Sequence, residues 1–409
     1  MPTSTALRDH IPIACALMCA LLSPSVFGQG RYDDALLSVK RLFASNEVAA
    51  LSEPYVGIAT SKGITPGLFP IKSTGVSTEP VRQAAEKLLA TLTRAQVFKT
   101  LFAVDDVEWR KWSNVDNGIY VRQGISLEEM TAPQREAAFG LMRESLSAKG
   151  VQLSLDIMKT DQTLREINND ALRYGEQQYF FTVMGRPSAE EPWGWQLEGH
   201  HLVVNFFVLG DQVVMTPLFL GGEPVVTETG KYAGNTILQD EQNQGLALLQ
   251  SFTEDQRKKA VLGYEKSADF LQAQAGRDNL VLDYAGIPAA SLTADQKLKL
   301  LELIDTFVGN LREEHARIRM DQVQLHLAET YFAWIGRSDA DAVFYYRIHS
   351  PVILIEFDHQ NPVGTRRLLP AARPTRQHIH TIVRTPNGND YGKDLLRQHL
   401  ELHPHPLPF

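Results

Sequence analysis

The sequence has little cysteine, no long apolar run and no basic block. Its 409 residues include two cysteines, Cys15 and Cys19, both inside one apolar stretch near the start. If that stretch is removed, no disulfide, thiolate ligand or cysteine nucleophile remains, so a metal would be held by histidines and carboxylates. Because 40 Lys+Arg stand against 48 Asp+Glu, for a net charge of -8, we expect no nucleic-acid partner.

Several catalytic signatures are also missing. The sequence contains no Gly-x-Ser-x-Gly elbow, no His-Glu-x-x-His pair, no Walker loop and no Gly-x-Gly-x-x-Gly fingerprint. Serine hydrolases, zincin proteases and nucleotide-binding enzymes are therefore disfavoured. The composition, with 44% hydrophobic and 22% charged residues, is typical of a folded globular chain.

The apolar stretch at residues 11–22 follows Arg8 and leads into small residues that end at Gly28. This order is typical of a signal peptide. The stretch is too short to cross a bilayer core of about 30 Å as a helix. We therefore expect residues 1–28 to be a signal peptide, the mature protein to be periplasmic or secreted, and no membrane association after cleavage.

Two segments match each other without a gap at an offset of 151 residues, which is the spacing from Arg186 to Arg337. The match runs from residues 180–206 to residues 331–357. Four helix starts also share one pattern, an apolar residue, then Thr, two residues and Gln, which is a capping box. Their threonines are Thr93, Thr131, Thr253 and Thr293.

These patterns predict an α+β fold, because strands follow helices in each half. We expect two pseudo-symmetric helix-then-strand repeats packed into one composite domain, with half 1 at residues 80–225 and half 2 at residues 240–385. Four prolines favour an irregular N-terminal segment over residues 29–80. Residues 386–409 are expected to form a C-terminal helix and tail. The expected strands are 193–198, 201–209, 212–216, 344–349, 352–357 and 377–383.

Histidine is concentrated near the end, where seven of 12 fall in the last 61 residues. His378 and His380 are two apart on a predicted strand, so both rings leave one face, about 7 Å apart at the backbone, and can bind one ion. His200 and His201 are adjacent and face opposite sides of a regular strand, so one of them is the expected ligand unless Gly199 permits a bulge.

The internal match adds further candidates. At the offset of 151 residues, His349 matches Glu198 and Glu356 matches Asn205. A cleft shared by the two halves could bring these side chains together. The candidate metal ligands are His200, His201, His349, His378 and His380. The candidate catalytic residues are Glu356 and Asp358, and the candidate substrate-binding residues are Arg347, Arg384 and Tyr391. A buried network of histidines and carboxylates without metal is the alternative.

Several short motifs resemble those of an uncharacterised family of exported bacterial and fungal proteins, classed as a domain of unknown function. They are Gly199-His200-His201, Arg347-Ile-His349, Glu356-Phe-Asp358, His378-Ile-His380 and Asn389-Asp390-Tyr391-Gly392. The resemblance covers most of the mature chain. It implies a shared fold and site, and no reaction.

Three functions fit these residues. The first is an exported metal-dependent hydrolase with a His-rich site between two repeats, where Glu356 or Asp358 serves as base. Zinc is favoured, because three imidazoles hold it and leave a position for water. The second is a copper- or iron-dependent oxidoreductase. The third is a non-catalytic protein whose aromatic residues bind a saccharide or another small molecule.

Overall fold

The computed structural model describes residues 29–368 and 373–403. The helices are α2 (Gln29–Leu51), α3 (Glu79–Thr91), α4 (Arg94–Thr100), α5 (Ala132–Ser145), α6 (Ala148–Asn168), α7 (Gln239–Gln250), α8 (Glu254–Ala260), α9 (Ala294–Val308), α10 (Glu313–Leu325) and α11 (Lys393–Leu402). The strands are β1 (Leu101–Phe102), β2 (Ile125–Ser126), β3 (Phe180–Met184), β4 (Trp193–Gly199), β5 (Leu202–Leu209), β6 (Gln212–Val214), β7 (Leu218–Gly222), β8 (Val261–Gly263), β9 (Ile287–Pro288), β10 (Tyr331–Gly336), β11 (Phe344–His349), β12 (Leu354–His359) and β13 (Ile379–Arg384). The predicted signal peptide lies outside the described residues.

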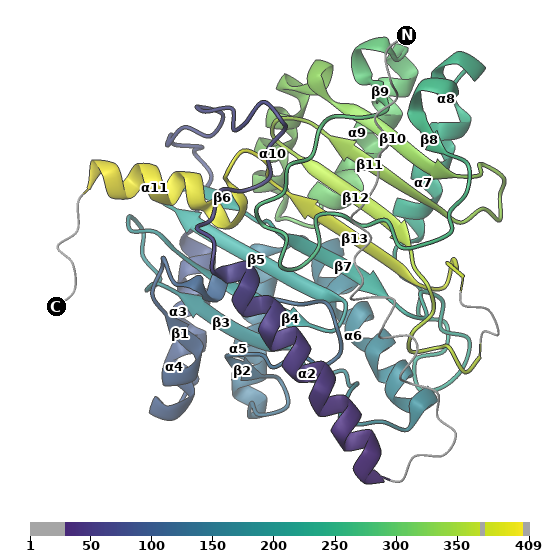
Figure 1. Ribbon diagram of the computed structural model, residues 1–409. Helices are drawn as coiled ribbons and strands as arrows, with labels where there is room; N and C mark the ends of the chain where they lie inside the picture. Colours follow the sequence, from purple (N-terminus) through teal and green to yellow (C-terminus); the bar gives the residue numbers. More distant parts are fainter. Residues whose placement is uncertain (1–28, 369–372, 404–409) are drawn as a thin grey trace.

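These elements form an α+β protein around one mixed sheet, which has 13 strands in the described residues (Figure 1). The main path is β1-β3-β4-β5-β7-β13-β12-β11-β10-β8, so strands from the two halves of the chain meet where β7 pairs with β13. β1 is parallel to β3 and β8 is parallel to β10, whereas the other pairings are antiparallel.

The four predicted capping boxes are confirmed. At each of these helix starts the Gln side chain accepts a hydrogen bond of 2.9–3.0 Å from the backbone N–H of the preceding Thr. The boxes also contact in pairs, because Gln134 Nε2 donates to Gln96 Oε1 and Gln296 Nε2 donates to Gln256 Oε1, each at 2.9 Å. These contacts fix where α4 and α5, and likewise α8 and α9, begin relative to each other.

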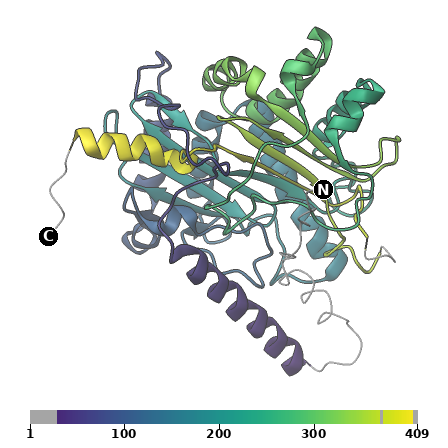
Figure 2. The same cartoon turned by 45° about the horizontal axis from the view of Figure 1, so that its top comes forward.

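The N-terminal segment differs from the prediction, because α2 is a 23-residue helix rather than irregular chain. Residues 31–53 contain no proline or glycine, and the next proline, Pro54, follows the end of the helix. Pro80 lies in the first turn of α3, where its missing N–H removes no intrahelical bond. Figure 2 shows α2 projecting from the body of the protein. Only the residues between α2 and α3 are irregular.

The two faces of the sheet differ. One face packs apolar side chains such as Trp195, Phe206, Tyr346 and Phe357 against α3, α5, α6, α7 and α9. The opposite face, which we call the polar face, carries buried polar side chains because residues alternate along each strand. They are Gln196, Glu198, Asn205, Arg347, Glu356, Asp358 and Arg384, and half-buried His380 lies beside Asp358. Of the helices that the structure describes, none is long and apolar enough to span a membrane.

Candidate metal centre

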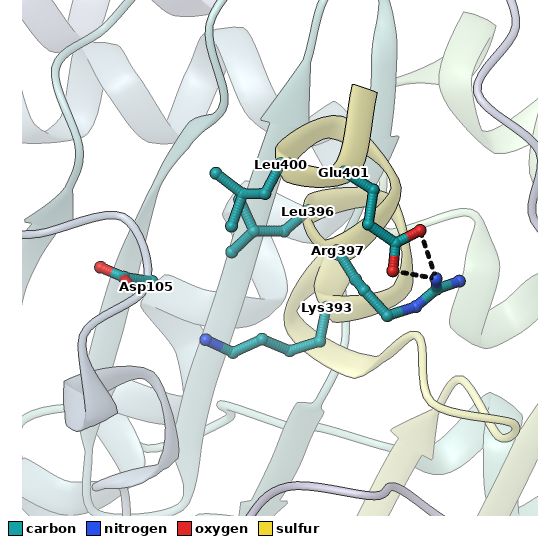
Figure 3. Close-up of a pocket in the computed structure, with 6 residues that line it drawn as sticks. All are labelled: Asp105, Lys393, Leu396, Arg397, Leu400 and Glu401. Atoms are coloured by element: carbon teal, nitrogen blue, oxygen red, sulfur yellow. Dashed lines mark hydrogen bonds and ion pairs between the residues drawn. The ribbon is translucent and has the colours of Figure 1, made fainter. Parts of the chain in front are cut away.

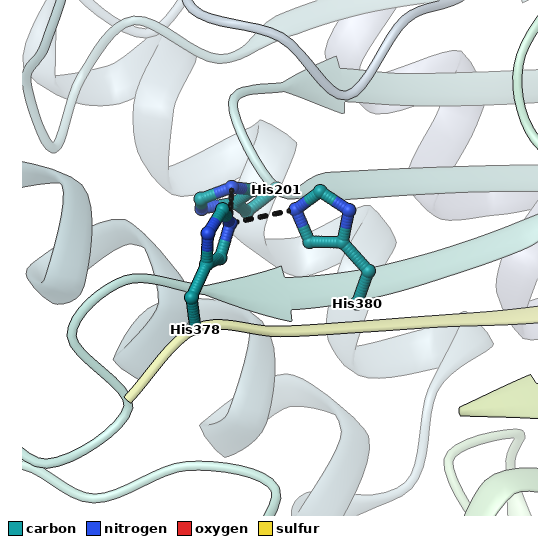
Figure 4. A group of neighbouring side chains, drawn as sticks. All are labelled: His201, His378 and His380. Carbon is teal, nitrogen blue, oxygen red and sulfur yellow. Dashed lines mark hydrogen bonds between the residues drawn. The ribbon is translucent and has the colours of Figure 1, made fainter. Parts of the chain in front are cut away.

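Three histidines direct their Nε2 atoms toward one point at the edge of the polar face (Figure 4). His378 Nε2 lies 3.3 Å from His201 Nε2 and 2.9 Å from His380 Nε2. The ligand atoms of the three residues all lie within 4.8 Å of one another. A tetrahedral zinc ion with bonds of about 2.0–2.1 Å separates its ligand nitrogens by about 3.3 Å. The donor set and its spacing therefore fit a divalent transition metal.

Hydrogen bonds between the imidazoles do not fully explain why two other histidine nitrogens face His378 Nε2. His378 Nδ1 donates to the carbonyl oxygen of Asn361 at 2.6 Å, and Glu223 Oε2 lies 3.6 Å from the same nitrogen. In the neutral ring, Nε2 then has one lone pair, which can accept one hydrogen bond. Two imidazole nitrogens nevertheless face it. A cation between the three nitrogens would use all three lone pairs, and the contact to Asn361 is the support that metal-binding histidines commonly have.

The turn between β4 and β5 places His201 in this group. His201 adopts a left-handed φ of 62°, which is strained for a non-glycine residue. Its N–H donates to the carbonyl oxygen of Asn114, and its own carbonyl oxygen accepts from Gly221 N at 2.8 Å. Gly221 in turn pairs with His380 in the β7–β13 ladder. His201 in the turn, Gly221 on β7 and His380 on β13 are therefore neighbours in one row.

Gly221 leaves space beside the imidazole of His380. A Cβ atom at this position would lie 3.2 Å from His380 Cδ2 and 2.8 Å from the Ile379 carbonyl oxygen. We expect Gly221→Ala to displace His380 and to weaken metal binding by about 10- to 100-fold. Chelator competition measures the affinity.

Gly222→Ala is the matched control for Gly221→Ala. The added Cβ would meet Ile237 Cδ1 at 2.3 Å on the opposite face of β7, so stability can fall without contact with the histidines. Equal metal affinity in the two variants would contradict the role assigned to Gly221.

His200 lies beside the group and does not belong to it. Its ring stacks on that of His201 with 3.9 Å between centroids. His200 Nδ1 lies 2.6 Å from Asp161 Oδ1, and Asp161 also accepts from Gly175 N. The prediction that the two rings face opposite sides is wrong, because both residues lie in the turn and not in the regular strand.

The surroundings favour neutral imidazoles. Burial lowers the pKa values of His201 and His380 well below the usual range, and the neighbouring imidazoles lower them further. Neutral imidazole is the form that binds a metal. His201 and His378 are buried, whereas His380 is half-buried.

Asp358 is in register with this centre, because it pairs with His380 in the β12–β13 ladder. It accepts from Phe270 N at 2.7 Å and Leu271 N at 3.1 Å, and Lys266 Nζ lies 3.0 Å from its Oδ1. The side chains of Lys266 and Asp358 are fully buried. Burial raises the pKa of Asp358 to about 7, although Lys266 opposes the shift.

Glu356 lies one step further along the polar face, opposite Ile382. Its carboxylate accepts from Ala273 N at 2.7 Å, from Gln272 N at 3.1 Å and from Tyr345 Oη at 2.6 Å. Glu356 and Asp358 together fasten residues 270–273 to the sheet. Sequence reasoning proposed both as catalytic residues and did not identify this anchoring contact.

His349 is not brought to the centre. It pairs with Leu354, which pairs with Arg384, and Arg384 lies four residues along β13 from His380. At about 3.3 Å per residue this is roughly 13 Å. The His349 ring packs 4.6 Å from that of Tyr284, and burial lowers its pKa to about 3.

The candidate substrate-binding residues are also separate from the histidine group. Arg384 is fully buried and forms ion pairs with Asp278 at 2.8 Å and Asp390 at 2.7 Å. Tyr391 Oη donates to Asp278 Oδ1 at 3.0 Å. Arg347 is 5% exposed and donates to the carbonyl oxygen of Asp283 at 3.2 Å.

Sequence reasoning missed the residues that support the centre. They are Asp161, Gly221, Glu223, Lys266 and Asn361. Gly221 could have been found from the sequence, because a glycine inside an apolar strand often marks a place where a ligand or another part of the chain comes close to the backbone. The others come from a helix, from loops and from the end of a strand, and their spacing carries no pattern.

Together, the fold and the site define an α+β protein in which three histidines that could hold a metal ion lie at the ends of two central strands, β7 and β13. The chain belongs to the family described as protein of unknown function (DUF3500), whose model matches residues 74–393. That span includes all three histidines and both halves of the sheet. No curated protein and no solved structure matches the chain.

Proposed function

We propose that this chain is an exported metal-dependent hydrolase of a small-molecule or saccharide substrate, with its centre at His201, His378 and His380. The observation that carries the proposal is the convergence of three Nε2 atoms, which no fourth histidine, cysteine or carboxylate of the described residues joins. Three nitrogen ligands with an open position are typical of catalytic zinc sites, whereas structural sites use four protein ligands. When bound, zinc supplies Lewis acidity and lowers the pKa of its water to about 7.

Residues around the three histidines would have separate supporting roles in this reaction. Asn361 holds His378 in the tautomer that presents Nε2. Asp358 is the better placed of the two candidate carboxylates for an acid–base role, because it is in register with His380, whereas Glu356 faces Ile382. Lys266 keeps this carboxylate close to a positive charge. Half-buried His380 marks the side from which a substrate would approach.

Metal analysis of the mature chain, purified without a histidine tag, tests this proposal. We expect about one zinc ion per chain. Copper or iron would support an oxidoreductase instead, and a chain that binds no added metal would support a non-catalytic binding protein. The zinc-loaded chain should hydrolyse a chromogenic ester, phosphate or glycoside. If it turns over none of the three, the hydrolase assignment fails even when zinc is present.

Export is part of the same proposal. Its support is the order of residues 8–28, a basic residue, an apolar stretch and small residues. Mass spectrometry of the native protein should find a mature N-terminus near Gln29. An intact chain that begins at Met1 and stays in the cytoplasm would contradict export.

We also infer that the two halves are copies of one unit. In support, the pairings of β1, β2, β3, β4, β5 and β7 have counterparts in those of β8, β9, β10, β11, β12 and β13. The paired capping boxes are spaced by 38 and 40 residues. In an experimental structure, residues 180–206 should superpose on 331–357 with their neighbouring strands in the same order. A different order around these segments would contradict the inference.

A further inference from the structure

Asp269 connects an irregular segment of the chain to the support of the histidine centre. Its Oδ1 accepts two hydrogen bonds from Asn361, one from the backbone N–H and one from Nδ2, each at 3.0 Å. The carbonyl oxygen of the same Asn361 accepts from His378 Nδ1 at 2.6 Å. Asp269 is therefore linked by hydrogen bonds, through one intermediate residue, to one of the three histidines that could hold a metal ion.

Asn361 begins a short turn that a second carboxylate also holds. Glu223 is buried and accepts from the backbone N–H groups of residues 363–365 at 2.8–3.0 Å. Asp269 holds the other end of the turn, at Asn361. The Oδ1 atom of Asn361 is buried and has no partner among the described residues, so this side chain is held at its nitrogen only. Loss of Asp269 would release the end of the turn that carries the acceptor for His378.

The position of that acceptor determines whether His378 can bind a metal ion. When Nδ1 donates to Asn361, Nε2 keeps its lone pair and faces the other two histidines (Figure 4). A neutral imidazole can carry its proton on either nitrogen. Glu223 Oε2 lies 3.6 Å from Nδ1, which is too far for a hydrogen bond. If the Asn361 carbonyl oxygen moves away, the tautomer with its proton on Nε2 becomes populated, and that tautomer has no lone pair at Nε2 for a metal ion.

The segment that carries Asp269 also contacts a neighbour of His380. Phe270 and Leu271, the next two residues, donate their backbone N–H groups to Asp358. Asp358 pairs with His380 in the β12–β13 ladder. Residues 264–273 contain no helix or strand, so contacts of this kind hold the segment in place. The segment thus contacts residues that support or adjoin two of the three histidines.

We propose that Asp269 is a positioning residue of the metal centre and that it acts on His378 through Asn361. The inference rests on the function proposed above and adds a residue that touches neither the metal ion nor the substrate. The same contacts should couple the centre to residues 264–273, because coupling between two sites is reciprocal. A segment that fixes His378 is itself stabilised when His378 binds a metal ion.

Chelator competition with zinc tests the positioning role. We expect Asp269→Ala to weaken zinc binding by about tenfold, as loss of an outer contact of a metal ligand commonly does. Asp269→Asn should weaken it less, because its amide oxygen can still accept from Asn361. Cobalt can replace zinc, and its visible absorption depends on the arrangement of its ligands. The cobalt spectrum of Asp269→Ala should therefore differ from that of the parent.

Glu401→Ala is the matched control for Asp269→Ala. Glu401 is another exposed carboxylate that accepts two hydrogen bonds, both from Arg397 on α11, at 2.8 and 2.9 Å (Figure 3). Its substitution should leave the zinc affinity and the cobalt spectrum unchanged. Equal zinc affinity in Asp269→Ala and in the parent would overturn the inference, and so would an equal loss of affinity in Glu401→Ala.

Hydrogen exchange, measured at saturating zinc, tests the coupling. Zinc should slow the exchange of the amides of residues 270–273 in the parent and should slow it less in Asp269→Ala. The same slowing in both proteins would contradict the coupling through Asp269. If the parent binds no divalent metal, the proposed centre fails and the role of Asp269 fails with it. If the parent binds zinc and Asp269→Ala binds it equally well, the centre stands and only the positioning role fails.

Discussion

We expect the variant His378→Ala/His380→Ala to bind no metal and the parent to bind about one ion per chain. It removes two of three converging nitrogens, and His201 alone cannot hold a divalent ion against water. The helices should persist, because neither side chain belongs to the two apolar clusters of the core. Atomic emission gives the metal content, and far-ultraviolet circular dichroism gives the helix content.

Two single variants sharpen this expectation. His201→Ala should lose the metal, whereas His200→Ala should retain it, since only His201 belongs to the group. The two residues are adjacent, lie in one turn and are similarly buried at 4% and 8% exposure, so each controls for the other. His326→Ala, which changes a histidine that pairs with Glu329 just after α10, is a control outside the site. Loss of metal from His200→Ala alone would contradict the assignment of ligands.

Lys266→Met is expected to lower the free energy of unfolding by about 3–5 kcal/mol. The substitution leaves Asp358 ionised or forces it to take up a proton inside the protein, because both side chains are fully buried. Removing one partner of a buried ion pair typically costs this much. Urea unfolding with metal removed measures the effect without a contribution from ligand binding.

A double variant and a surface pair provide the controls for Lys266→Met. Lys266→Met/Asp358→Asn should be less destabilised than the sum of its single variants, because no unpaired charge remains. Lys258→Met breaks a pair whose side chains are 58% and 79% exposed and should cost less than about 1 kcal/mol. Equal losses in Lys266→Met and Lys258→Met would contradict the importance of the buried pair.

Local patterns in the sequence predict the elements well. The capping boxes begin helices at Thr93, Thr131, Thr253 and Thr293, and the expected C-terminal helix is α11. His378 and His380 share a face because two residues is the period of a strand. These features depend on neighbours within a few residues, which the sequence displays directly.

The failures concern positions fixed by distant contacts. The internal match suggested that His349 joins the site through its equivalence to Glu198. β4 and β11 are separated by five antiparallel pairings, so they run in opposite directions and their C-terminal ends lie at opposite edges of the sheet. The stacking of His200 on His201 depends on the turn and on Asp161 from α6, 39 residues away. The spacing of residues in the sequence indicates neither the relative direction of β4 and β11 nor the contact with Asp161.

Anomalous diffraction at the zinc edge, from crystals of the mature chain purified without a tag, tests the three-histidine centre most directly. We expect one anomalous peak between His201 Nε2, His378 Nε2 and His380 Nε2, at about 2.0–2.1 Å from each. Crystals soaked in zinc should show the same peak if the metal is lost during purification. Hydrogen-bonded imidazoles without a peak in the soaked crystals, or a zinc ion bound only elsewhere, would contradict the account.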